Sequence, residues 1–160
     1  MAHTRFEQSM TVAAPVERVR AALATLTAHD RLHPLIVSVE ALPDGVAVDG
    51  SALSRYRIVD RVRMGPLTLR VIYRAEIAVD ATCAVVSDAY QSPGVHLHVV
   101  AQLTALPATA GATQTRVDET VTVEAPRLLL GYVRAQAQRS HTALYTNLKR
   151  WLESESPSLA

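Results

Sequence analysis

The sequence predicts an α+β fold in which a curved antiparallel sheet of seven strands packs against one long C-terminal helix. Two observations lead to this prediction. Residues 126 to 153 have the spacing of an amphipathic helix, and residues 35 to 124 read almost entirely as strands joined by short turns. Short links between successive strands favour an antiparallel meander. A lone amphipathic helix has to cover its apolar stripe with another layer, here the sheet.

The first elements along the chain are a strand and a short helix. Residues 5 to 13 alternate apolar and polar side chains, as a strand does. Pro15 then suits the first turn of a helix, where its missing N–H has no partner to lose. Apolar residues share one face of this helix: Val16, Val19, Leu23 and Leu26. A break near His29 and Asp30 leads to a turn or a second short helix, which ends before Pro34 because a residue preceding proline resists the helical conformation.

Six further strands are expected before the C-terminal helix. They cover residues 35–43, 47–63, 67–80, 83–91, 95–106 and 113–124. Residues that favour chain reversal separate them: Asp44-Gly45, Gly65-Pro66, Pro93-Gly94 and the segment Pro107–Gly111. Alternation along each strand predicts which side chains face the helix, and it places Tyr56, Tyr73, Val99 and Glu119 on the inner face. Both phases of residues 83–91 are mixed, so their inner face stays unassigned.

The C-terminal helix begins after Pro126, which suits a first helical turn. Its apolar stripe recurs at steps of three and four residues: Leu130, Val133, Ala137, His141, Leu144, Leu148 and Trp151. A curved sheet around such a helix leaves room for a cavity. The small Ala, Val and Leu side chains that dominate the composition agree equally well with an open cavity and with layers that simply approach closely.

Composition limits the classes of function. A net charge of +1 with interspersed signs argues against nucleic acid as a partner, and no apolar run is long enough for a transmembrane segment. The polar start of the chain lacks the apolar core of a signal peptide. A single cysteine, Cys83, excludes an internal disulfide, and its neighbours Ala84 and Val85 suggest a buried, inert thiol. We therefore expect one domain over residues 1–160 in the cytoplasm, of undetermined oligomeric state.

A short pattern near the N-terminus resembles a known family. The pattern consists of Val12, Ala14, Pro15, Glu17 and Val19. It is similar to the opening of the bacterial polyketide cyclase/dehydrase and lipid-transport branch of the START-like, or Bet v 1-like, superfamily (SRPBCC proteins). Arg20 and the segment Leu32-His33-Pro34 depart from the branch, because a tryptophan is common at both places. The resemblance covers residues 5 to 153 and implies the helix-grip fold, with a hydrophobic ligand cavity beneath the C-terminal helix.

Glu119 and His141 are the two residues singled out as candidates for chemistry. A carboxylate on an otherwise valine face has to be paired, protonated or solvated, since an isolated buried charge is costly. An imidazole on the helix's apolar stripe could bind a ligand or transfer a proton. Glu119 could equally sit at a wet cavity edge, and His141 could be a core residue with its own partner. If the chain is an enzyme, these two are the predicted proton-transfer pair; whether they touch is left open.

The predicted ligand site lies between the helix and the sheet. Its residues are Tyr56, Tyr73, Val99, Glu119, Val133, Ala137 and His141. No metal site is expected, because His96 and His98 face outward without a third ligand and Cys83 lies elsewhere. No phosphate-binding loop or cofactor motif occurs, so no cofactor is expected. The leading hypothesis is binding or transport of a small hydrophobic molecule, such as a lipid, polyketide or aromatic compound. The alternatives are a cyclase/dehydrase-type enzyme that uses the same cavity, and a protein-interaction module.

Overall fold

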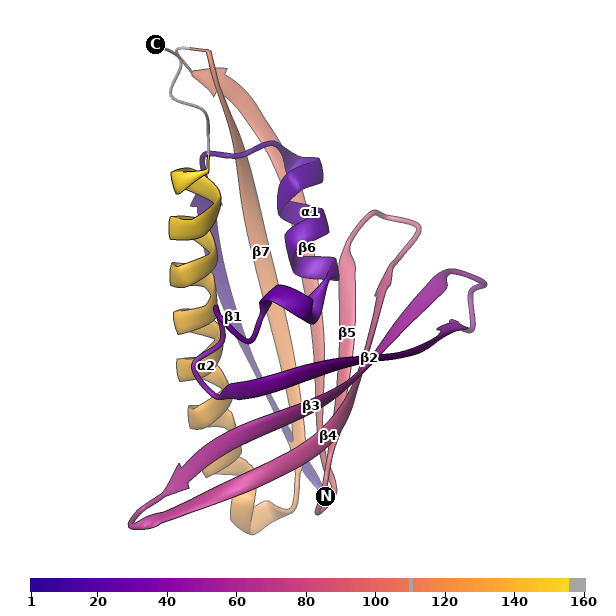
Figure 1. Cartoon of the computed structure of the whole chain (residues 1–160), viewed down its shortest axis with the longest axis vertical. Coiled ribbons are helices and arrows are strands. Elements are labelled where there is room, and N and C mark those ends of the chain that lie inside the picture. The colour runs from indigo at the N-terminus through magenta and orange to yellow at the C-terminus, as the bar shows by residue number, and fades with distance from the viewer. Residues whose placement is uncertain (110, 156–160) are drawn as a thin grey trace.

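The computed structural model describes residues 1–109 and 111–155, except for the side chains of Ala28, Ala108 and Thr109. Seven strands form one antiparallel sheet in the order β1-β7-β6-β5-β4-β3-β2 (Figure 1). The strands are β1 (Ala2–Val12), β2 (Ile36–Val46), β3 (Ala52–Met64), β4 (Leu67–Val79), β5 (Val85–Gln91), β6 (Val95–Thr109) and β7 (Ala112–Ala125). The helices are α1 (Val16–Ala24), the 3-10 turn η1 (Leu26–Ala28) and α2 (Arg127–Ser154). The predicted α+β helix-grip architecture is confirmed.

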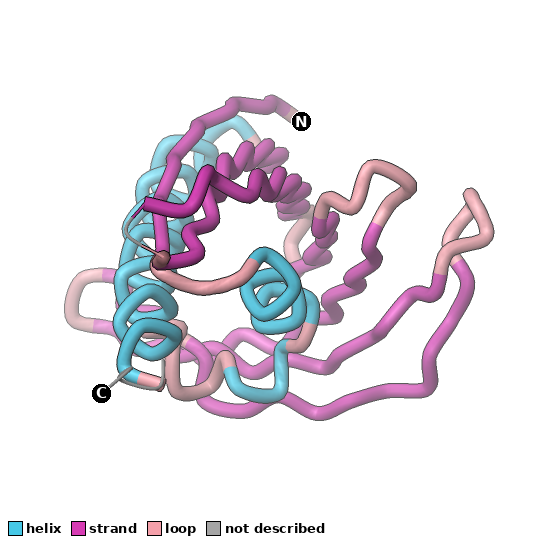
Figure 2. Tube along the Cα trace, turned by 90° about the horizontal axis from the view of Figure 1, so that it is seen from above, coloured by secondary structure: helices cyan, strands magenta, loops and turns pink. Residues whose placement is uncertain are grey.

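The sheet bends around an interior that α2 closes on one side. Figure 2 shows the strands curving around this interior, with α2 along one side and α1 within the curve. Helix α2 packs against β1 and β7, so it lies near one edge of the sheet and faces the inner surface of the other strands. Because α2 contacts β1 and β7, the space between α2 and strands β3 to β5 is where a cavity can form.

The predicted stripe on α2 is buried in part: Ala137, Leu144 and Leu148 are buried, and the other four residues are half-buried. The backbone N–H groups of Leu129 and Leu130 donate to the carbonyl of Pro126, at 2.8 and 3.1 Å, and so begin the helix at the expected place. In the C-terminal half, Leu148 and Leu152 have no exposed surface. They pack with residues of β1 and α1 in one core cluster, whereas Ala137 belongs to a second cluster with Phe6. The C-terminal half of α2 is therefore solidly packed.

The turn predicted at Asp44-Gly45 is wrong. Strand β2 continues through these residues to Val46, and the chain reverses over residues 47–51 instead. The register between β2 and β3 shifts between Leu42 and Gly45. An irregularity of this kind takes up extra residues without ending the strand, so a dipeptide typical of turns lies inside a strand.

Cys83 is exposed, contrary to the expectation of a buried thiol. It lies in the turn between β4 and β5 with a φ of 62°, and strand β5 begins at Val85, not at residue 83. The Asp80 side chain organises this turn, because its Oδ1 accepts hydrogen bonds from the backbone N–H groups of Thr82 and Ala84 at 2.8 and 3.0 Å. A turn held by its own aspartate orients the cysteine outward, although the flanking residues are apolar.

The remaining boundaries agree with the sequence within a few residues. Strand β1 begins at Ala2, earlier than expected, and β6 continues through Pro107 to Thr109. The expected turn over Pro107–Gly111 is therefore shorter, and Ala110 lies outside the described residues. Strand β5 now has an assigned face, since Ser87, Ala89 and Gln91 line the interior.

Candidate ligand cavity

A cavity of about 300 Å³ lies between α2 and the inner face of the sheet. Its wall is mostly aliphatic, and the described part of the wall contains no lysine or arginine. Met64 and Leu69 belong to the wall and are 38% and 41% exposed, so the cavity reaches the surface beside the hairpin of β3 and β4. Ligand sites in proteins occupy about 300 to 1,000 Å³, so this cavity suits a small molecule.

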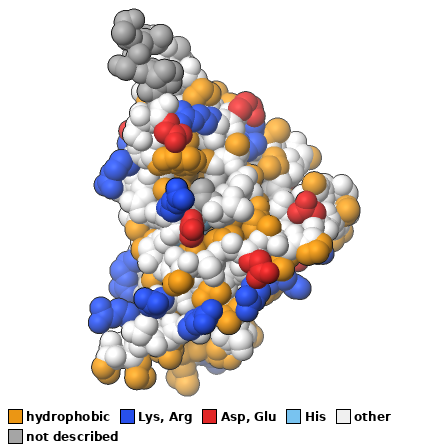
Figure 3. All heavy atoms as spheres, in the orientation of Figure 1, with side chains coloured by type: hydrophobic (Ala, Val, Ile, Leu, Met, Phe, Trp, Pro, Cys, Tyr) orange, Lys and Arg blue, Asp and Glu red, His pale blue; other side chains and the backbone are white. Residues whose placement is uncertain are grey.

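The elements beside the opening carry exposed positive charges. Arg61, Arg63 and Arg70 on the hairpin and Arg127 at the start of α2 are all exposed. No acidic residue occurs between Arg61 and Arg74 or between Arg127 and Arg150 in the sequence. On the face drawn in Figure 3, Lys and Arg side chains gather over the lower part of the molecule, and an acidic side chain lies beside those on the right. Charges that line an approach route bias which ligands reach it.

Glu119 and His141 are in contact across the cavity wall. Glu119 lies on β7 and is 3% exposed; its Oε1 is 3.0 Å from Nδ1 of His141 on α2. Gln8 on β1 donates a 2.6 Å hydrogen bond from Nε2 to the other carboxylate oxygen. Because a carboxylate only accepts, Nδ1 of His141 carries the donated proton. The buried carboxylate is thus satisfied at both oxygens.

The opposite nitrogen of His141, Nε2, has no hydrogen-bond partner among the described residues. His141 belongs to the cavity wall, and its ring meets Phe6 and His33 edge-on, with centroids 6.1 and 6.5 Å apart. With the proton held on Nδ1, a neutral His141 offers the Nε2 lone pair to a molecule in the cavity. The imidazole can therefore accept a hydrogen bond or take a proton there.

His33 supplies a donor on the same side of the cavity. Its Nδ1 accepts the N–H of Leu35 at 3.3 Å, so a neutral ring carries its proton on Nε2. Burial, with the neighbouring His141 and His29, lowers the pKa of His33 to about 3. His29, also buried, bonds through Nε2 to the Ala22 carbonyl at 3.0 Å, and burial lowers its pKa too. His33 is therefore a neutral donor at ordinary pH.

Asp60 and Tyr73 form a second polar group on the cavity wall. Asp60 on β3 is 5% exposed, and its Oδ2 accepts a 3.3 Å hydrogen bond from the Tyr73 hydroxyl on β4. Its Oδ1 is buried without a partner among the described residues. Burial raises the pKa of Asp60 to about 6, and the bond from Tyr73 opposes that rise. Burial and the Asp60 carboxylate raise the pKa of the Tyr73 hydroxyl.

Tyr145 on α2 is a further polar residue of the cavity wall. Its hydroxyl is buried and has no partner among the described residues that meets hydrogen-bond geometry. Burial, followed by the nearby Glu119 carboxylate, raises its pKa well above the usual value. The phenol stays protonated, so Tyr145 is a neutral group at the edge of the Glu119 network.

The structure places six of the seven predicted ligand residues on the cavity wall: Tyr73, Val99, Glu119, Val133, Ala137 and His141. Tyr56 on β3 is buried in the core and is not part of the cavity wall. Sequence reasoning missed Asp60 and His33. Asp60 stands between Ile58 and Val62 in the inward phase of its strand, and that position alone could have identified it.

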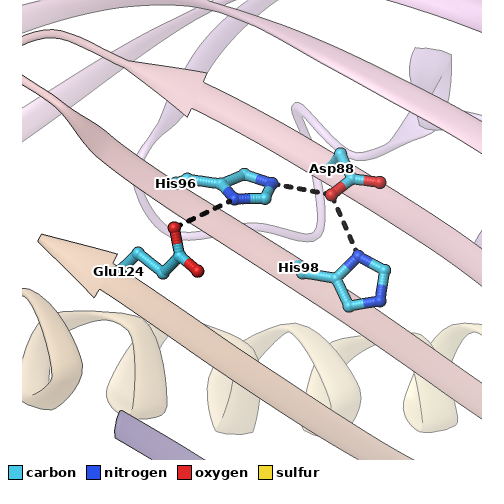
Figure 4. A network of polar contacts seen from close by, with 4 residues as sticks. All are labelled: Asp88, His96, His98 and Glu124. Atoms are coloured by element: carbon cyan, nitrogen blue, oxygen red, sulfur yellow. Dashed lines mark hydrogen bonds and ion pairs between the residues drawn. The ribbon is translucent and has the colours of Figure 1, made fainter. Parts of the chain in front are cut away.

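His96 and His98 form a separate cluster on the outer face of the sheet. Figure 4 shows both imidazoles turned toward Asp88, with His96 also close to Glu124. Asp88 Oδ1 lies 2.7 Å from His96 Nε2 and 2.9 Å from His98 Nδ1. Nδ1 of His96 lies 3.8 Å from Oε2 of Glu124. In the part of the chain that the structure describes, no group of three or more His, Cys, Asp or Glu residues has the arrangement of a metal site.

Solved structures share this fold over nearly the whole chain. An aromatase/cyclase, ZhuI, from Streptomyces sp. R1128 matches with a TM-score of 0.66 at 19% identity, over 95% of this chain and 94% of that one. A START superfamily protein from Mycobacterium smegmatis matches with a TM-score of 0.63 at 16% identity, over 96% and 99%. Ara h 8.0201 matches with a TM-score of 0.62 at 17% identity, over 96% and 100%.

Comparison by sequence gives no further relative. No family model matches the chain, and no curated protein matches it. At these low identities the structural likeness concerns the fold, and the fold implied by the N-terminal pattern is confirmed. Across residues 1–109 and 111–155, no helix is long and apolar enough to cross a membrane.

Proposed function

We propose that this chain, which has the helix-grip fold of the START-like, or Bet v 1-like, superfamily, binds a small hydrophobic molecule beneath α2. Members of that superfamily bind hydrophobic ligands or act as cyclases. The observation that carries the proposal is the cavity of about 300 Å³, whose aliphatic wall is interrupted by a few polar groups. Sites of this composition bind apolar molecules and orient them through their polar groups.

Filling the cavity tests the proposal directly. Ala137 lies on the cavity wall and is 7% exposed, so Ala137→Trp introduces an indole into the space that a ligand would occupy. We expect at least a tenfold weaker affinity for Nile red, a neutral apolar fluorophore, because the bulk of the indole excludes it. Ala135→Trp is the matched control, since Ala135 is on α2 but not on the cavity wall. Equal Nile red titrations for both folded variants would contradict the proposed site.

Native mass spectrometry of freshly purified protein provides an independent test. A small molecule that co-purifies with the wild type and is lost from Ala137→Trp would define the ligand by its mass. We also propose that the chain forms one domain and lies in the cytoplasm. The free Cys83 agrees with a reducing compartment.

A cyclase/dehydrase-type enzyme is the second candidate. It is favoured by the Glu119–His141 hydrogen bond, which fixes the proton on Nδ1 and leaves Nε2 on the cavity wall. A base oriented by a carboxylate is a recurrent arrangement for proton transfer. The structurally similar ZhuI is an aromatase/cyclase. The polar groups are few, but much of an enzyme's rate can come from orienting a reactive chain.

Substitution separates the enzyme from the binder. For an enzyme, His141→Ala and Glu119→Gln should each lower turnover of a polyketide-like carbonyl substrate by about 100-fold or more. For a binder, the same variants change only the affinity for a ligand. Turnover that persists in a folded His141→Ala variant would reject His141 as the base.

A further inference from the structure

The cavity and its opening carry opposite charges. Arg61, Arg63, Arg70 and Arg127 are exposed near the opening, whereas the wall contains acidic side chains and neither lysine nor arginine among the described residues. A cationic ligand is repelled on approach, and a carboxylate is repelled inside, where the lower dielectric strengthens such repulsion. The two regions together favour a neutral ligand.

Asp60 is a carboxylate of the wall with a buried oxygen that has no hydrogen-bond partner among the described residues. Glu119, by contrast, is bonded at both oxygens, to His141 and Gln8. The Asp60 Oδ2 accepts the Tyr73 hydroxyl, whereas Oδ1 has no partner among the described residues, although the side chain is 5% exposed. Buried polar atoms in native proteins almost always have a partner, so Oδ1 points to one that a ligand supplies.

We infer that the cavity selects a neutral apolar molecule bearing a hydroxyl group, and that Asp60 Oδ1 accepts the hydrogen bond from this hydroxyl. Tyr73 is a positioning residue, since its hydroxyl fixes the other oxygen of the carboxylate. The inference rests on the proposed function and adds the chemical class of the ligand. An ionised carboxylate only accepts, so an ether or an ester in place of the hydroxyl leaves Oδ1 unpaired.

Matched naphthalenes test the inference by displacement of Nile red at about pH 8, where Asp60 is ionised because its pKa is about 6. Naphthalen-2-ylmethanol supplies the donor, and its methyl ether has the same framework without the donor. We expect the alcohol to bind about tenfold tighter or more than the ether, as expected for a hydrogen bond to a charged group. The corresponding amine and 2-naphthoate should both bind more weakly than the alcohol.

Asp60→Val should reduce the alcohol-to-ether ratio to about one while Nile red still binds. Asp118→Val is the matched control, because Asp118 is on β7 beside Glu119 but bonds to Ser9, outside the cavity wall. It should keep the full ratio. Tyr73→Phe should lower the ratio without abolishing it, because Asp60 remains but is less firmly held.

The outcomes are distinguishable. Equal affinities for alcohol and ether in the wild type, or a preference that survives Asp60→Val, would overturn this inference and leave the proposed function standing. Tighter binding of the amine or of 2-naphthoate than of the alcohol would overturn the neutral-ligand part. If neither Nile red nor any naphthalene binds, as checked by saturation-transfer NMR, both the proposed function and the inference are rejected. The wild-type comparison needs no variant to fold.

Discussion

Both faces of the sheet carry hydrogen bonds between a histidine and a carboxylate, but these bonds are buried on the inner face and partly exposed on the outer face. On the inner face, Glu119 is 3% exposed and bonds His141, whose side chain is 14% exposed. On the outer face, Asp88 is 25% exposed and bonds His96 and His98, whose side chains are 29% and 42% exposed. On the outer face, water can replace a lost hydrogen-bond partner, whereas on the inner face it cannot. Hydrogen bonds of similar length on the two faces therefore differ in the free energy that is lost when they are broken. Length alone therefore does not identify which histidine–carboxylate pair matters.

The largest effect is expected for Glu119→Ala. Removing this buried carboxylate leaves Nε2 of Gln8 and Nδ1 of His141, on two half-buried side chains, without their partner. The free energy of unfolding should fall by about 3 to 4 kcal/mol, as for other broken buried pairs. Urea denaturation monitored by circular dichroism measures it. If the free energy of unfolding fell no more than in Asp88→Ala, the Glu119–His141 pair would have to be well solvated.

An effect of intermediate size is expected for Asp60, in the pH dependence of the free energy of unfolding. Burial raises its folded-state pKa from 3.8 to about 6, so the folded protein holds this proton more tightly than the unfolded chain between those values. The free energy of unfolding should therefore decrease as the pH rises from about 4 to about 6 and stay lower above, by about 2 to 3 kcal/mol from this group.

Asp60→Asn isolates that contribution, because the amide does not ionise while the other groups titrate as before. The difference in unfolding free energy between wild type and variant should change over this pH interval and be constant above about pH 7. Urea titrations at a series of pH values give the difference. Parallel profiles for the two proteins would show that Asp60 is not desolvated.

The smallest effect is expected for Asp88→Ala on the outer face. His96 also stacks on Tyr90, with ring centroids 4.7 Å apart, and the half-exposed imidazoles can turn to water. The loss should stay below about 1 kcal/mol, as for exposed ion pairs. A loss as large as that for Glu119→Ala would remove the distinction between the two faces.

Sequence periodicity predicted most of the fold because the apolar spacing on α2 and the alternation along β4, β6 and β7 reflect burial directly. It failed where local hydrogen bonds override composition. The irregularity between Leu42 and Gly45 carries β2 through an apparent turn, and the Asp80 side chain turns Cys83 outward. Such features depend on the partner strand or on a single side chain, so a dipeptide pattern does not contain them.

Most residues of the candidate site were predictable from the sequence, but the distances between them were not. Alternation and helical spacing place Glu119 and His141 inward, yet their 3.0 Å contact depends on where α2 crosses the sheet. His33 reaches the cavity through the turn after η1, for which no periodic pattern exists. Asp60 was also missed, but its inward phase between Ile58 and Val62 could have been read from the sequence.

One contact at the opening has a consequence for how this protein can diverge. The Tyr132 hydroxyl on α2 donates a 3.0 Å hydrogen bond to the backbone carbonyl of Arg63, and so ties the β3–β4 hairpin to the helix. A carbonyl belongs to every residue type, so this attachment is indifferent to the side chain at position 63. Evolution can vary the charge around the opening, and with it the molecules that are attracted, without loosening the hairpin. The tyrosine is the half of the contact that cannot change freely.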